Sequence, residues 1–171
     1  MSHDISKIVD SVVRQVLSDG ESVLKSPKAV KRSGLDRMTL AAAKELIGAV
    51  EKKAAEMGVK AVVAVSDASG NVVAVECMDD AYIASYDIAV NKAFTVTSLK
   101  MPTKDLATLA APGGSLYGIQ FTNNGRIVIF GGGEPLMNAG KVIGGLGVSG
   151  GTAEQDTKLG EYGKMYFETQ M

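Results

Sequence analysis

The sequence predicts an α+β domain in which helices flank an antiparallel sheet. Two β-rich runs, residues 59–66 and 72–78, are separated by residues 67–71, whose Asp, Ser, Gly and Asn composition is typical of a hairpin turn. Helical patterns stand on either side of this pair, at residues 38–57 and 82–100. Because strands joined by tight turns pair in antiparallel fashion, we expect one antiparallel sheet covered by helices.

The helix at residues 38–57 has apolar residues three or four positions apart, which places them on one face. Gly58 directly after it is a typical stop signal. The apolar face consists of Leu46, Ile47, Val50, Ala54 and Met57.

The second half of the chain continues the alternation of helices and strands. The helix at residues 82–100 ends before Pro102, and a short helix is expected at residues 103–110. The final helix begins at Thr152, which has capping-box spacing to Gln155. The remaining expected strands are residues 126–130, 141–148, a short one near 117–121 and another at 134–138.

Three segments are expected along the chain: a helix in residues 1–20, a polar linker at 21–37 and the domain at 38–171. Residues 4–17 place Ile and Val side chains on one helical face and polar side chains on the other. Such a helix needs a partner because a lone helix of this length is marginal in water.

The partner of residues 4–17 stays open at this point. The helix could fold back onto the domain or an oligomer partner, or lie on a membrane surface, although its polar face carries few cations. A short amphipathic helix followed by a polar linker also resembles the encapsulation peptides of bacterial microcompartment cargo proteins. That resemblance implies docking to a shell or cargo protein.

The composition excludes several classes of protein. The net charge of −1 and the pI of about 5.9 argue against a nucleic-acid partner. No apolar run reaches the roughly 18 residues of a membrane span. The sole cysteine, Cys77, fits a reducing cytoplasmic compartment. The sole histidine, His3, lies near the N-terminus, so a catalytic triad or imidazole metal site within the domain is not expected.

Four strings carry a family resemblance. They are VSDASG at 65–70, SYDIAVNKA at 85–93, FGGGEPL at 130–136 and GGLGVSGGTAEQD at 144–156. Together they resemble the GlcG/HbpS family, which includes the C-terminal domain of PduO-type corrinoid adenosyltransferases. The resemblance implies a profilin-like fold, homo-oligomers, association with haem or a corrinoid and work inside microcompartments. The adenosyltransferase domain of those proteins has no counterpart here, so that activity is not carried over.

Two glycine-rich segments are candidate binding elements. Gly131, Gly132 and Gly133, followed by Glu134, need a close neighbour, and we interpret them as a pocket wall. Gly150, Gly151 and Thr152 precede a helix, where free backbone N–H groups could bind a propionate or another carboxylate. A simple capped helix start explains the same residues equally well.

Individual side chains are also candidates for ligand binding. Cys77, Tyr82 and Tyr117 are possible soft or phenolate ligands of iron, with core or rim positions as the more ordinary roles. Lys92 could reach a ligand, with a surface salt bridge as its more ordinary role, and Asp156 is expected to favour the dipole of the last helix.

These observations favour a non-catalytic protein that binds haem or a corrinoid and serves a microcompartment as cargo. Two alternatives remain: an enzyme that acts on a small metabolite or cofactor in the glycine-rich pocket, and a structural cargo-assembly module. No coherent set of catalytic residues emerges from the sequence, so binding is the preferred hypothesis.

Overall fold

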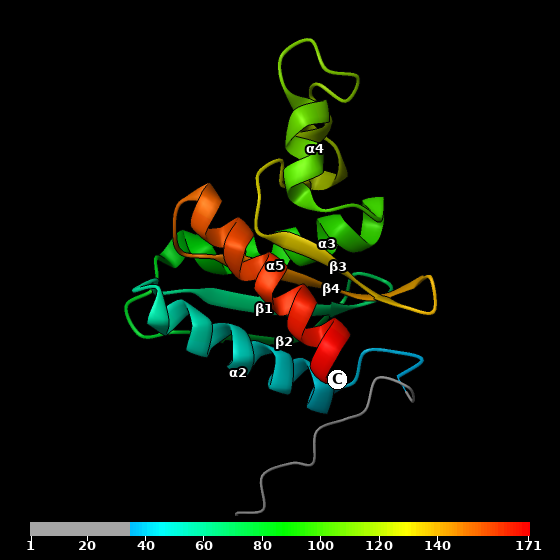
Figure 1. The fold of residues 1–171 in the computed structure, drawn as a ribbon. Helices are drawn as coiled ribbons and strands as arrows, with labels where there is room; N and C mark the ends of the chain where they lie inside the picture. Colours follow the sequence, from blue (N-terminus) through cyan, green and yellow to red (C-terminus); the bar gives the residue numbers. More distant parts are fainter. Residues whose placement is uncertain (1–34) are drawn as a thin grey trace, which may run out of the picture.

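A four-stranded antiparallel sheet forms the centre of the domain in a computed structural model that describes residues 35–171 (Figure 1). The strand order is β2-β1-β4-β3, so the two hairpins lie side by side. The predicted helix at residues 4–17 lies outside the described residues. The elements are α2 (Leu40–Glu56), β1 (Val62–Asp67), β2 (Val72–Cys77), α3 (Ile83–Leu99), α4 (Thr103–Ala110), the 3-10 turns η2 (Ile119–Phe121) and η3 (Asn123–Gly125), β3 (Gly133–Asn138), β4 (Lys141–Ser149) and α5 (Ala153–Gln170).

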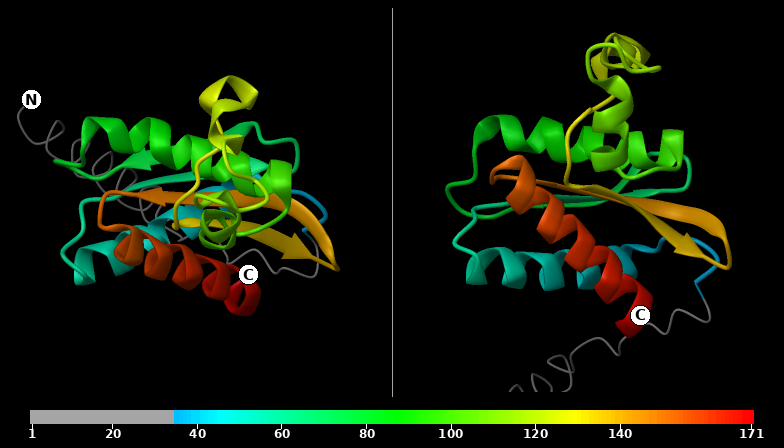
Figure 2. Two further views of the ribbon diagram at one scale, coloured as in Figure 1. Left: turned by 90° about the horizontal axis from the view of Figure 1, so that it is seen from above. Right: turned by 45° about the horizontal axis from the view of Figure 1, so that its top comes forward.

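The helices cover both faces of the sheet. Helix α3 lies on one face, and α2 and α5 lie together on the other (Figure 2). The face under α2 and α5 holds the larger core, in which Leu46, Leu146 and Phe167 are fully buried. The predicted α+β class is therefore confirmed. None of the described helices is long and apolar enough to cross a membrane.

Local sequence signals explain the ends of the helices. The Thr39 side chain accepts a hydrogen bond from the Ala42 N–H and caps α2, which ends before Gly58 in a left-handed conformation. The predicted capping box of Thr152 and Gln155 is present at the start of α5. Packing of the domain begins within the predicted linker, because Leu35 is already buried.

Small residues bring α3 unusually close to β4. A Cβ atom at Gly147 would collide with the Ala89 carbonyl group, and one at Gly145 would collide with that of Ala93. Glycine on the strand therefore lets the helix backbone approach the sheet directly. As a consequence, the end of β4 and the following residues lie against the first half of α3.

Two predicted strands are wrong. Residues 126–130 form no strand: Arg126 lies in a turn with helical dihedral angles, and the Val128 N–H donates to Oγ1 of Thr95 on α3 at 3.0 Å instead of to another strand. Residues 117–121 form turns and η2, with Gly118 in a left-handed conformation that interrupts extended structure. The strand expected at 134–138 is confirmed as β3.

Helix α4 and the residues after it project from the body of the domain (Figure 1). This projecting segment, residues 103–126, exposes large side chains: Tyr117 is 67% exposed and Phe121 is 83% exposed.

Candidate functional site

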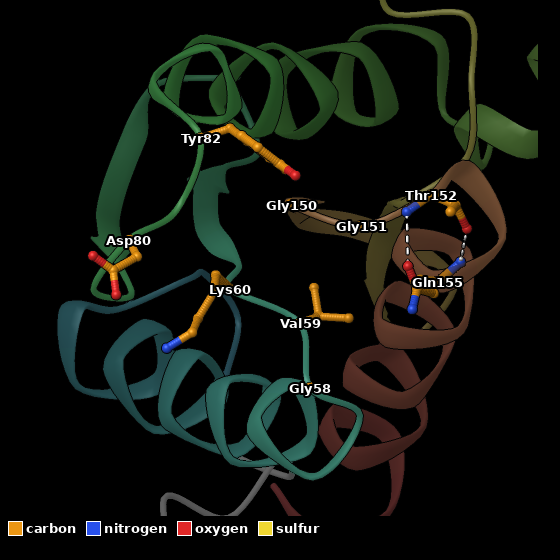
Figure 3. A pocket seen from close by; sticks show the side chains of 9 residues that line it. All are labelled: Gly58, Val59, Lys60, Asp80, Tyr82, Gly150, Gly151, Thr152 and Gln155. Carbon is orange, nitrogen blue, oxygen red and sulfur yellow. Dashed lines mark hydrogen bonds between the residues drawn. The ribbon is translucent and has the colours of Figure 1, made fainter.

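A depression of about 450 Å³ lies at the end of the sheet where β1 begins and β4 ends (Figure 3). We call it the terminal pocket. Three segments meet there: the link from α2 to β1, the link from β2 to α3 and the link from β4 to α5. Its lining residues are Gly58, Val59, Lys60, Asp80, Tyr82, Gly150, Gly151, Thr152 and Gln155.

Tyr82 stands at the N-cap position of α3, and its hydroxyl group points into the terminal pocket in Figure 3. The residue is 73% exposed, so a ligand would have direct access to the phenol. Asp80, two residues earlier, adopts a left-handed backbone conformation with φ of 64°. A non-glycine residue in that conformation is uncommon and fixes a sharp turn before the helix.

The Gly150–Thr152 wall uses its backbone donors within the chain. The Gly151 N–H donates to Oδ1 of Asp156 at 2.9 Å, and the Thr152 N–H donates to Oε1 of Gln155 at 2.9 Å. These two donors are therefore engaged within the chain, as in the capped helix start that the sequence also allowed. Gly150, Gly151 and Thr152 line the pocket as one of its walls.

A buried ion pair lies directly behind this wall. Nζ of Lys92 on α3 donates to Oδ2 of Asp156 at 2.8 Å and to the Val148 carbonyl at 2.7 Å. The Phe130 ring covers the ammonium, with its centroid 4.8 Å from Nζ. Lys92 is completely buried and Asp156 is 3% exposed. The expected surface salt bridge of Lys92 is therefore wrong, whereas Asp156 lies in the first turn of α5 as expected and also holds the buried ammonium.

Burial lowers the pKa of the Lys92 ammonium, while the neighbouring Asp156 carboxylate opposes that effect. The sequence contained a signal for this position. Lys92 falls on the same helical face as Ser85, Ala89 and Val96, all of which are buried. The charge of Lys92 suggested a solvent-exposed side chain, but its position in the helical repeat placed it on the face of α3 that packs against the sheet.

The segment Gly131–Gly133 lies apart from the terminal pocket and packs against its own chain. A Cβ atom at Gly132 would lie 2.7 Å from Nζ of Lys92 and 2.8 Å from Cβ of Asp156. One at Gly133 would lie 2.7 Å from Cγ2 of Thr103. The close neighbours that these glycines require are therefore α3, α4 and α5.

Glu134 lies in a second depression, of about 380 Å³, near the ends of α4 and α5. It is 3% exposed, and Nζ of Lys164 donates to its Oε2 at 3.2 Å. Burial raises the pKa of the Glu134 carboxyl group, and Lys164 partly offsets the rise. At the exposed edge of this depression, Lys104 pairs with Glu161.

The other two predicted iron ligands also lie outside the terminal pocket. Cys77 is an exposed free thiol in a depression of about 370 Å³, beside Met78 and Asp79. Lys60 borders both that depression and the terminal pocket. Tyr117 belongs to the projecting segment. Of these three candidate iron ligands, only Tyr82 lines the terminal pocket. The predicted binding residues Gly150, Gly151 and Thr152 line it as well.

The donors of the terminal pocket determine which cofactor it could hold. Residues 35–171 contain no histidine and no group of three or more Cys, Asp or Glu side chains arranged for a metal ion. The pocket does offer the Tyr82 phenol, a type of group that binds haem iron in some proteins. Beside it on α3, Ile83 is 97% exposed and Tyr86 is 51% exposed. A phenol with adjacent apolar side chains and a nearby lysine fits an iron porphyrin that carries carboxylates.

The model of the family described as "haem degrading protein HbpS-like" matches residues 38–163. The chain belongs to the HbpS-like family. An uncharacterised 15.0 kDa protein from the dhaT–dhaS intergenic region of Citrobacter freundii is 50% identical over 131 residues, which cover 77% of this chain and 92% of that protein.

Two further comparisons place this HbpS-like chain beside PduO. The corrinoid adenosyltransferase PduO of Citrobacter freundii is 38% identical over 117 residues, 68% of this chain. The match spans 35% of PduO, so the chain corresponds to about a third of that protein. The solved complex of PduOC with haem is 34% identical, with a TM-score of 0.73, and covers 75% of this chain and 94% of the other. The family therefore includes a member with bound haem.

Proposed function

We propose that this HbpS-like protein binds a tetrapyrrole in the terminal pocket, and that haem is the preferred ligand. The observation that carries the proposal is the likeness to PduOC, which was solved with haem and shares 34% of its residues with this chain. The pocket adds a phenol and a lysine to its lining, and the exposed Ile83 and Tyr86 follow Tyr82 in the first turn of α3. The corrinoid alternative rests on the similarity to PduO.

Different residues around the terminal pocket would contact different parts of a flat ligand that carries carboxylates. Ile83 and Tyr86 offer apolar surface to the macrocycle, and Lys60 offers an ammonium group to a propionate. Tyr82 places its hydroxyl where it can face the iron. Haem would supply an iron centre able to bind small ligands or change oxidation state, and the protein would orient it and limit its exposure.

The test is an absorbance titration of the full chain with haemin and, separately, with cobalamin. We expect saturable spectral change with haemin at micromolar concentration. Tyr82→Phe should shift the bands of the bound haem, because it removes the phenol oxygen and keeps the ring. The matched control Tyr86→Phe should leave those bands unchanged.

His3→Ala completes this set because His3 is the sole imidazole of the chain. Unchanged spectra in Tyr82→Phe with altered spectra in His3→Ala would overturn the role of Tyr82. Saturable change with cobalamin and none with haemin would move the proposal to a corrinoid. No change with either ligand would refute tetrapyrrole binding.

We also propose that the protein acts as a cytoplasmic homo-oligomer. The exposed Tyr117 and Phe121 of the projecting segment supply apolar surface for a second copy. Light scattering coupled to size exclusion should report an oligomer for the full chain. Phe121→Ser should lower its mass, and Met165→Ser, which removes an exposed apolar side chain of α5, should not.

The third part of the proposal is that residues 4–17 dock the protein to the shell or cargo of a bacterial microcompartment. Its support is the amphipathic pattern of these residues, which precede the family match at residues 38–163. A fluorescent protein fused to Met1–Gly20 should concentrate at a co-expressed shell. A fusion with Ile8 and Val12 changed to Asp should stay diffuse, and diffuse signal from both fusions would refute the docking role.

A further inference from the structure

The geometry points to a positioning role for the Lys92–Asp156 pair: we infer that it fixes the Gly150–Gly151 wall of the terminal pocket and thereby sets the affinity for the ligand. This inference deepens the proposed function and rests on it. Neither residue lines the pocket, so each would act through the backbone that it holds.

The two carboxylate oxygens of Asp156 accept hydrogen bonds from two different partners, one in the pocket wall and one on α3. Oδ1 accepts the Gly151 N–H at 2.9 Å, and Oδ2 accepts from Nζ of Lys92 at 2.8 Å. Charge-assisted hydrogen bonds of this kind are about twice as strong as neutral ones. The position of a pocket residue is therefore linked through one carboxylate to a buried ammonium on α3.

The same ammonium also holds the strand end before the wall. Nζ of Lys92 donates to the Val148 carbonyl at 2.7 Å, three residues before Gly151. Two residues, Val148 and Gly151, are thus attached to one charge centre, and Gly150 lies between them in the chain. The wall between these two attachments has little freedom to move.

The wall also packs against another lining segment. A Cβ atom at Gly150 would collide with the carbonyl of Lys60, so the wall passes directly beside that segment. A second polar contact, between the hydroxyl groups of Ser85 and Ser149 at 3.1 Å, ties the wall to the first turn of α3, next to Tyr82. A shift of the wall would therefore change the shape of the pocket at both Lys60 and Tyr82.

The loss of the charges and the loss of the Gly151 acceptor can be separated by two double variants. Lys92→Met with Asp156→Asn removes both charges and keeps an oxygen that can accept the Gly151 N–H. Lys92→Met with Asp156→Leu removes both charges and that acceptor, with a side chain of similar size. Neither variant leaves an unpaired buried charge, which would destabilise the fold for an unrelated reason.

The first readout uses the ligand-free full chain and measures hydrogen exchange of the Gly151 amide. We expect about tenfold faster exchange in the Leu variant than in the Asn variant, because a hydrogen bond to a buried acceptor protects the amide. The second readout is the haemin titration, in which the Leu variant should bind about tenfold more weakly, as is common when a group behind a binding residue is removed.

Equal Gly151 exchange and equal affinity in the two variants would overturn the inference. If Gly151 exchanges faster in the Leu variant but the unmodified chain binds no haemin, the proposed function is refuted and the positioning role of the pair is retained. If the Leu variant does not fold, Asp156→Glu decides instead, since it keeps the charge for Lys92 and displaces the carboxylate. An unchanged Gly151 exchange rate and unchanged affinity in Asp156→Glu would likewise overturn the inference.

Discussion

The segments Gly131–Gly133 and Gly150–Gly151 look alike in the sequence and serve different purposes in the fold. The first is enclosed by the protein, because its missing side chains leave room for Lys92, Asp156 and Thr103. The second lines the terminal pocket and opens to solvent on one side. Both segments border the same ion pair: Gly132 lies close to Lys92 and Asp156, and the Gly151 N–H donates to Asp156.

This difference teaches what a run of glycines does and does not indicate. Glycine indicates that something lies close to the backbone, but the sequence does not reveal whether that neighbour is a ligand or the chain itself. Substitutions at the two segments should therefore separate their roles. A packing glycine should chiefly affect stability, and a wall glycine should chiefly affect ligand binding.

The largest effect is expected for Gly132→Ala. Gly132 has φ of 112°, and its new Cβ atom would lie 2.7 Å from both Nζ of Lys92 and the Val148 carbonyl. We expect a loss of stability of about 3 kcal/mol or more, from overpacking together with backbone strain. Chemical denaturation of the full chain measures it, and a loss below about 1 kcal/mol would contradict the enclosed packing described for this segment.

A smaller stability effect is expected for Gly151→Ala. The new Cβ atom would lie 2.7 Å from Oε1 of Gln155, which can rotate away, and 2.8 Å from its Cβ atom, which requires a small shift of this exposed backbone. The displaced Gln155 loses one bond of the capping box, so the cost in stability should be about 1 kcal/mol. Haemin affinity should fall in this variant. Full affinity with a large stability loss would reverse the roles assigned to the two segments.

The raised pKa of Glu134, directly after the first segment, predicts a pH dependence of stability. The folded chain binds this proton more tightly than the unfolded chain, because burial disfavours the carboxylate. The contribution of Glu134 is therefore complete below its ordinary pKa, about 4.3, and is lost as the pH rises through the raised value. Relative to the unmodified chain, Glu134→Gln should lack this decline between acidic and neutral pH.

Lys164→Met supplies the control for that measurement. Lys164 opposes the rise in the Glu134 pKa, so its removal should make the decline of stability with pH steeper. Denaturation curves collected across the pH range for all three proteins give the comparison. Parallel curves for the unmodified chain and Glu134→Gln would show that Glu134 does not titrate differently on folding.

The smallest effects are expected for exposed residues that belong to neither segment and do not line the terminal pocket. Tyr117→Ser and Cys77→Ser change positions that are exposed in the single protomer, so each should alter the stability of the protomer itself by at most about 0.5 kcal/mol. Neither should change the absorption bands of bound haem, because neither residue lines the terminal pocket. A spectral change in Cys77→Ser would move the iron to the neighbouring depression beside Met78.

Local patterns predicted most of the fold because they act over short distances. The turn at 67–71, the stop at Gly58 and the cap at Thr152 each depend on neighbouring residues, and all three are confirmed. The segment 126–130 was wrongly predicted as a strand, because its buried backbone donor finds Thr95 on α3 instead of another strand. That choice depends on a contact between distant residues.

The candidate site was only partly predictable for the same reason. Tyr82 and Gly150–Thr152 were each identified from local signals, and the structure brings them together. Their separation from Cys77, Tyr117 and Glu134 follows from the tertiary arrangement. The role of Lys92 was missed because its charge was given more weight than its position on the buried face of α3.

The most direct test of tetrapyrrole binding in the terminal pocket is paramagnetic broadening of amide NMR signals by haemin bound to the full chain. High-spin iron broadens nearby signals, so binding in this pocket should remove the amide signals of Lys60, Tyr82 and Gly151 at one equivalent of haemin. The amide signals of Glu134 and Gly140, which do not line the pocket, should be retained. Broadening centred on Glu134 or on Tyr117, or none at saturating haemin, would contradict binding in the terminal pocket.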